Sequence, residues 1–164
     1  MDLYTYSYYN ITEKTYIEHS IMNRFNDWLK QAEKDMEAAI DSEEDKHYEW
    51  ACFQAQQSAE KALKALLLFL NIDSWGHGLI YLLKEWKRIS EEEEMQFNED
   101  EYKELIEKCQ DLDRHYIQPR YPNGFASGYP AEFYNQKTAK ECIGYAESII
   151  RFVKEKIKEI SSSK

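Results

Sequence analysis

Proline, the residue least compatible with the interior of a helix, occurs in this chain only at positions 119, 122 and 130. It lacks an amide hydrogen, and its ring clashes with the preceding helical turn. Outside the segment that holds these prolines, residues 23–90 and 99–160 show helical patterns. The same segment also holds Gly124 and Gly128. A helical chain that is interrupted once is expected to carry its functional groups at the interruption, because loops on a rigid scaffold commonly do so.

Apolar side chains recur at three- and four-residue intervals in five segments, the pattern of a helix with one buried face. These segments are about residues 22–40, 47–70, a helix that begins after residue 78, residues 99–117, and a last helix capped by Asn135. The second segment has a row of alanines at 51, 55, 59 and 62, which would let a neighbouring helix approach closely. The pattern predicts an all-α, antiparallel up-and-down bundle of four or five helices, with one Pro/Gly-rich loop before the last helix.

The chain length of 164 residues suits a single domain with one core. We expect residues 21–160 to form the bundle. Residues 1–20 are polar and rich in tyrosine, and we interpret them as an extension that lies on the domain or on a partner chain. They lack a signal-peptide pattern, and the longest apolar run, residues 65–70, is too short to cross a bilayer. We therefore expect a cytoplasmic protein without membrane contact.

The formal net charge of −10 argues against a broad basic face that wraps duplex DNA, but it leaves room for a small basic pocket. The three cysteines, Cys52, Cys109 and Cys142, are far apart and lie in apolar helical patterns. We expect them to be buried free thiols in a reducing compartment. Because the chain has no CxxC motif and no His/Asp/Glu set with metal-ligand spacing, we predict neither a metal site nor a cofactor.

The main candidate binding site lies where the helices break. It comprises Arg114, His115, Tyr116, Arg120 and Tyr121. Two guanidinium groups can clamp a phosphate, tyrosine rings can stack on bases, and prolines stiffen the loop. The site would then bind a nucleotide or RNA. In the alternative, structural role, the arginines form ion pairs with Asp111, Asp113 or Glu132 and lock the loop onto the bundle; contact with another protein is a third possibility.

Three further candidates are less specific. Lys61 and Lys64 share a polar row with two glutamines and could form one wall of a groove beside the break, or simply a solvated helix face. His115 could act as a general base, since its ordinary pKa lies near neutrality, but the sequence gives it no catalytic partner. His77, just before the third helix, is more typical of a capping or packing histidine.

Four segments in order resemble the HEPN family of helical domains. They are AQQSAEKALKA at residues 55–65, HGL at 77–79 followed by Leu82 and Leu83, LDRHYI at 112–117 followed by PRYP at 119–122, and residues 139–146 of the last helix. The resemblance covers about residues 22–158. It implies a bundle of four or five helices, usually a dimer, and many members bind a minimal nucleotidyltransferase. Other members are ribonucleases or non-catalytic binding modules for nucleotides or RNA.

The ribonuclease motif of this family is an arginine followed, after four to six residues, by a histidine. No arginine of this chain has a histidine at that distance; Arg114 and His115 are adjacent instead. We therefore expect a non-catalytic module that binds nucleotide or RNA and works as a dimer with a nucleotidyltransferase partner, in the manner of a toxin–antitoxin pair. A metal-independent ribonuclease using Arg114, His115 and Arg120 and a purely structural interaction domain are the alternatives.

Overall fold

The computed structural model describes residues 24–163, so the expected extension at residues 1–20 lies outside the described residues. Within that range the chain forms helices and turns, without a β-strand. The long helices are α2 (Phe25–Glu44), α3 (Tyr48–Phe69), α4 (Leu79–Glu92), α5 (Glu99–Asp113) and α7 (Gln136–Ser162). The segment before α7 holds two short 3₁₀ turns, η1 (Gln118–Arg120) and η2 (Pro122–Gly124), and one α-helical turn, α6 (Pro130–Phe133). The all-α prediction is confirmed.

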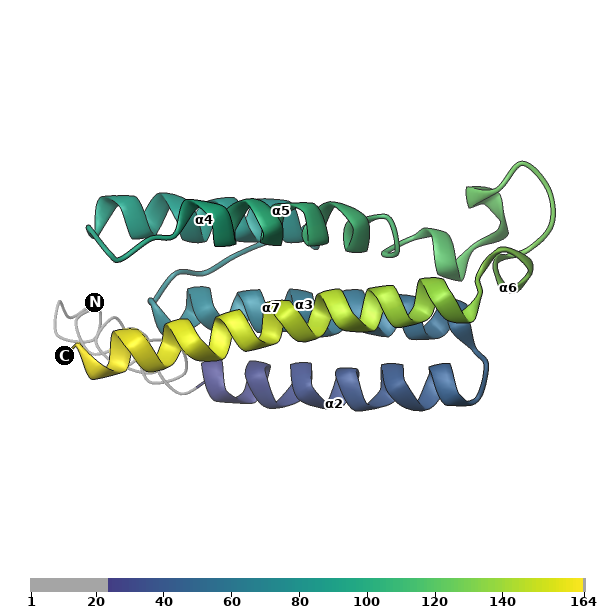
Figure 1. Ribbon diagram of the computed structural model, residues 1–164, viewed down its shortest axis with the longest axis horizontal. Helices are drawn as coiled ribbons and strands as arrows, with labels where there is room; N and C mark the ends of the chain where they lie inside the picture. Colours follow the sequence, from purple (N-terminus) through teal and green to yellow (C-terminus); the bar gives the residue numbers. More distant parts are fainter. Residues whose placement is uncertain (1–23, 164) are drawn as a thin grey trace, which may run out of the picture.

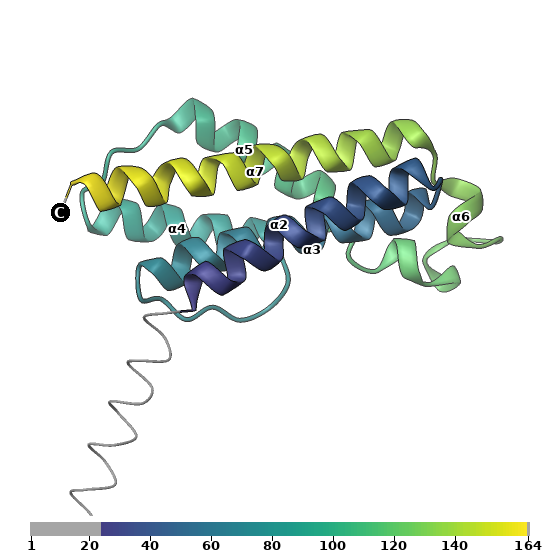
Figure 2. The ribbon, with the colours of Figure 1, turned by 90° about the horizontal axis from the view of Figure 1, so that it is seen from below.

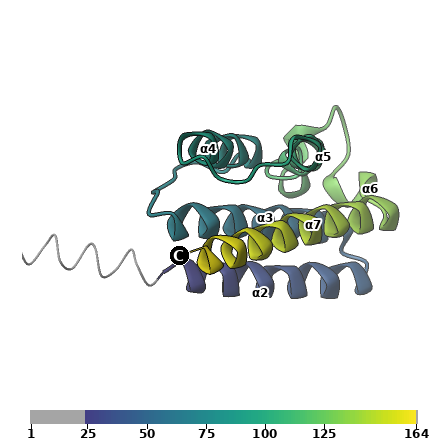
Figure 3. The ribbon, with the colours of Figure 1, turned by 60° about the vertical axis from the view of Figure 1, so that its left-hand side comes forward.

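The helices form three layers (Figure 1). Helices α3 and α7 lie in the middle, with α2 on one side and the α4–α5 hairpin on the other, as Figure 3 also shows. In the view from below, α2 is the nearest helix (Figure 2). The connection after α3 runs back along that helix. A hydrogen bond marks its end there, since Gln56 Nε2 donates to the His77 carbonyl oxygen at 3.0 Å. Helix α4 therefore begins beside the first half of α3, which brings residue 77 close to the end of α5.

The central layer is packed through small residues, as the alanine row predicted. Ala51, Ala55, Ala59 and Ala62 of α3 are all fully buried, and so is Ala32 of the neighbouring α2. The Ser58 hydroxyl donates to the Ala32 carbonyl oxygen at 2.6 Å, so the two backbones approach closely at this point. No helix among residues 24–163 is both long and apolar enough to cross a membrane.

Two of the predicted helix ends were wrong. Helix α5 ends at Asp113 instead of residue 117, and the amides of Arg114, His115 and Tyr116 bond to carbonyls three residues back in a tighter turn. Pro119, which has no amide hydrogen, prevents a regular continuation. Helix α2 continues to Glu44, and α7 continues to Ser162, where serine hydroxyls bond to carbonyls four residues earlier. The predicted Asn135 cap is confirmed, since its Oδ1 accepts from the Thr138 amide at 3.0 Å.

Asp113, the last residue of α5, caps the start of α4. Its two carboxylate oxygens accept from the amides of Leu79 and Ile80 at 2.8 and 3.2 Å. These amides have no partner within their own helix, because the first turn lacks preceding carbonyls. Burial raises the pKa of Asp113, although the two backbone hydrogen bonds act in the opposite direction. The contact fixes the end of α5, and with it the start of the candidate site, against α4.

Replacing Asp113 by alanine should lower the free energy of unfolding by about 0.5–2 kcal/mol, the usual cost of losing a helix cap. Asparagine at this position keeps one side-chain acceptor oxygen, so D113N should lose less than D113A. Urea denaturation followed by far-UV circular dichroism measures both. Equal stability of D113A and the unmodified chain would contradict the assigned cap.

Candidate functional site

Arg120, the last residue of the 3₁₀ turn η1, lies against aromatic rings. The carbon of its guanidinium group is 4.4 Å from the ring centre of Phe53, 4.8 Å from that of Tyr116 and 5.1 Å from that of Tyr121. Its Nε donates to the Tyr116 carbonyl oxygen at 2.8 Å. Cations within about 6 Å of an aromatic ring are attracted to its face, so the guanidinium is held in place without a carboxylate.

The two arginines of the predicted site differ in their charge partners. Arg114 forms the expected ion pair with Asp111, with Nη1 and Oδ1 3.1 Å apart, and its side chain is 71% exposed. Asp113 is used as the α4 cap instead. Among residues 24–163 the arginine ion pairs are those of Arg88 and Arg114, and Arg120 forms none. Arg120 is thus a fixed cation without a neutralising carboxylate in a chain whose formal net charge is −10.

His77 completes the aromatic surface. Its ring stacks on Tyr116, with ring centres 4.7 Å apart and planes inclined by 16°. Its Nδ1 lies 3.0 Å from Glu60 Oε1. The histidine therefore has the packing role that its position suggested. We call Phe53, His77, Tyr116, Arg120 and Tyr121 together the Arg120 face.

Glu60 connects this face to Lys64, one of the two predicted lysines. The carboxylate is almost fully buried, and Lys64 Nζ lies 2.9 Å from its Oε1. Gln57 Nε2 donates to the other oxygen at 3.1 Å. Lys64 is itself only 9% exposed, so it stabilises the Glu60 carboxylate that His77 contacts and has no surface role of its own. Lys61 lies elsewhere: its Nζ is 2.5 Å from Asp35 of α2.

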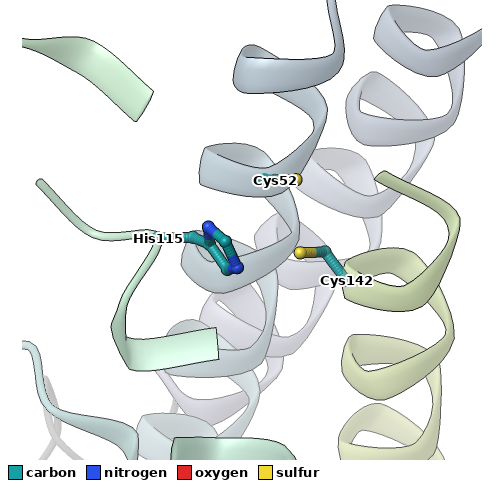
Figure 4. Close-up of side chains that lie close together, drawn as sticks. All are labelled: Cys52, His115 and Cys142. Atoms are coloured by element: carbon teal, nitrogen blue, oxygen red, sulfur yellow. The ribbon is translucent and has the colours of Figure 1, made fainter. Parts of the chain in front are cut away.

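His115 does not lie with the other predicted site residues. Its Nδ1 is 2.8 Å from the Tyr134 hydroxyl, and its ring points toward Cys142, with Cys52 close to both (Figure 4). Both cysteines are buried free thiols, as predicted, and so is Cys109. The hydrogen bond with Cys52 and the one with His115 lower the pKa of Cys142, although burial acts in the opposite direction. The hydrogen bond to Cys142, together with burial, raises the pKa of Cys52.

The Arg120 face has the chemistry of a phosphate and base recognition surface. A guanidinium presents planar N–H donors that match phosphate oxygens, and aromatic rings can stack on bases. Tyr121 is 47% exposed. Sequence reasoning identified Tyr116, Arg120 and Tyr121, but it missed Phe53 and gave His77 only a packing role. Phe53 lies on α3 far from the break in sequence, and no local signal marks it.

The helical bundle, with Arg120 held among three aromatic rings in the proline-rich segment before α7, defines a small, all-α domain. Comparisons with known proteins identify its family. The profile of the HEPN domain matches residues 25–156. The chain belongs to the HEPN family.

Individual relatives agree with this assignment. The chain is 32% identical over 145 residues to "Putative toxin MJ1304" of Methanocaldococcus jannaschii, covering 80% of this chain and 87% of that protein. Among solved structures it is similar to TT1696 from Thermus thermophilus, with 39% identity, a TM-score of 0.73 and coverage of 82% of this chain and 99% of that one. It is also similar to ST0689, an archaeal HEPN homologue, with 36% identity, a TM-score of 0.65 and coverage of 83% and 99%.

Proposed function

We propose that this protein is the HEPN component of a toxin–antitoxin-like pair and that it binds nucleotide or RNA at the Arg120 face. The observation that carries the proposal is Arg120 itself, a guanidinium positioned by three rings and free of a carboxylate partner. An arginine held in this way loses little conformational entropy when a phosphate binds. Exposed Arg114, at the end of α5 and six residues before Arg120, would supply a second cation in the same segment of the chain.

The proposed role is binding without RNA cleavage. The family's Arg-to-His spacing is absent, since Arg114 and His115 are adjacent. The His115 Nδ1 lies 2.8 Å from the Tyr134 hydroxyl and the ring points toward Cys142, so His115 is occupied by these partners and poorly placed to take a proton from a ribose at the Arg120 face. A general base must come within hydrogen-bond reach of the proton that it removes.

A protein partner is the second part of the proposal. Its support is the similarity to a protein named as a putative toxin, together with exposed aromatic side chains next to the start of α4. Trp75 is 90% exposed and Tyr81 is 77% exposed. Aromatic residues are enriched at protein interfaces. We propose that a minimal nucleotidyltransferase is the partner and that the HEPN chain acts as a homodimer.

Replacing Arg120 by alanine should weaken binding of fluorescently labelled ATP or a short RNA by about tenfold to a hundredfold, the effect of losing charge-assisted hydrogen bonds. Arg88 provides a matched control, because it is an exposed arginine that is already paired with Glu85 and Glu92 on α4. R88A should bind as the unmodified chain does. Fluorescence anisotropy titration at fixed salt measures all three proteins.

Equal affinities of R120A and R88A would refute the proposed site. R120K keeps the charge but lacks the planar fork, so we expect it to recover only part of the affinity. The same RNA should stay intact during the titration, as judged on a denaturing gel. Cleavage that is lost in H115A would instead support the ribonuclease alternative.

A further inference from the structure

Two cysteines and a histidine from three separate elements converge inside the bundle. Cys52 comes from α3, Cys142 from α7 and His115 from the turn after α5. The two sulfur atoms and a ring nitrogen of His115 all lie within 4.8 Å of one another (Figure 4). We propose that these three side chains bind a thiophilic metal ion, and Zn²⁺ in particular. The sequence-based expectation of no metal site considered only donors that are close together in the chain.

The donor positions fit a zinc ion after a small contraction. Zinc–sulfur and zinc–nitrogen bonds are about 2.3 and 2.0 Å long, which places tetrahedral donor atoms about 3.8 Å apart or slightly less. Drawing the three donors together by about 1 Å or less therefore closes the site. Two cysteines and one histidine are an established protein ligand set for zinc, and they leave a fourth position for water or another ligand.

Tyr134 holds the histidine in the orientation that a ligand requires. Its hydroxyl is 2.8 Å from His115 Nδ1, and the residue is only 8% exposed. When Nδ1 donates to that oxygen, the lone pair of Nε2 is available to a metal. Metal-binding histidines commonly use their second ring nitrogen in this way, which fixes both ring orientation and tautomer. Tyr134 is thus a positioning residue for the proposed site.

Charge balance also favours a divalent ion at this depth. Cys52 and Cys142 are 0% and 2% exposed, where an isolated charge would be costly. Two thiolates, one neutral imidazole and Zn²⁺ together carry no net charge. On binding, each thiol gives its proton to the solvent, and two metal–sulfur bonds replace two S–H bonds. His115 is only partly buried, so its side offers a path for the ion.

The proposed ion would tie the turn that precedes the Arg120 face to the α3–α7 core. Its ligands do not belong to the Arg120 face, so the site is distinct from the proposed nucleotide site. A ligand that binds only the folded chain stabilises it, so Zn²⁺ should raise the midpoint of thermal unfolding. Either proposal can fail without the other.

The test uses the full chain, kept reduced, with Co²⁺ and Zn²⁺ as the probes. Equilibrium dialysis followed by elemental analysis should find one Zn²⁺ per chain. Co²⁺ should give thiolate-to-metal charge-transfer absorption together with the visible bands of a tetrahedral site, and Zn²⁺ should abolish both. C52A and C142A should each bind about 100-fold more weakly, roughly one ligand's share of zinc binding energy. Y134F should bind about tenfold more weakly.

Cys109 supplies the matched control, because it is a fully buried thiol on α5 outside the cluster. C109A should keep the cobalt spectrum and the zinc stoichiometry. Absence of the thiolate bands from the reduced, unmodified chain would overturn the proposal, and this result does not depend on whether any variant folds. Retention of the bands in folded C142A, or their loss in folded C109A, would overturn it as well.

Discussion

Replacing Glu60 by leucine should lower the free energy of unfolding by about 3–5 kcal/mol, the usual cost of leaving one charge of a buried pair without its partner. Glu60 is 4% exposed and Lys64 is 9% exposed, and their charged atoms are 2.9 Å apart. In E60L the Lys64 ammonium would stay in the bundle beside a new apolar side chain. The Gln57 amide and the His77 ring would each lose an acceptor as well. Urea denaturation measures the change.

Two further variants separate charge from packing. The double variant E60L/K64L removes both charges, so it should recover much of the lost stability, because well-packed apolar residues can replace a buried pair. E37L breaks an ion pair with Lys34 in which the Glu37 side chain is 61% exposed, and it should cost less than about 1 kcal/mol. If E60L proves no more costly than E37L, the buried pair contributes little to stability.

The same variants bear on the Arg120 face. Glu60 accepts from His77 when that ring carries a proton on Nδ1, and His77 stacks on Tyr116, which in turn packs against Arg120. A carboxylate deep in α3 thereby helps to position a cation on the surface. Ligand binding measured on E60L/K64L, which keeps the fold without the carboxylate, would report how much of the site's order depends on this contact.

Much of the fold could be predicted from the sequence because it follows from local patterns. The spacing of apolar residues located the five long helices, and the alanine row on α3 predicted the close approach of a neighbouring helix, which is α2. The helix ends were less predictable. Residues 114–117 have helical patterning, but Pro119 removes a donor, and the turn tightens before it. Asp113 is drawn to the amides of α4, and that contact depends on tertiary structure.

The Arg120 face was predicted only in part, because some of its residues are brought in by tertiary structure. Arg120 and its neighbouring tyrosines stand out at the proline-rich break, whereas Phe53 and His77 reach them only because residues 70–78 run back along α3. The cluster of Cys52, His115 and Cys142 was even harder to predict from the sequence. Its members are separated by 63 and 27 positions, from 52 to 115 and from 115 to 142, so no spacing rule could connect them. Three elements must pack correctly before the donors meet.

Replacing Ala32 by leucine should destabilise the bundle by about 3 kcal/mol, the upper part of the usual range for extra carbon atoms in a well-packed core. Ala32 is fully buried, and its carbonyl oxygen accepts from the Ser58 hydroxyl at 2.6 Å, so α2 and α3 leave little room for a larger side chain. The two helices would have to move apart, and the buried alanines of α3 would lose their contacts with α2 too. K30L places a similar side chain at an exposed position of the same helix, and it should change stability by no more than about 0.5 kcal/mol. Urea denaturation of both variants tests this close approach directly. Similar stabilities for A32L and K30L would mean that α2 and α3 can move apart with little loss of stability.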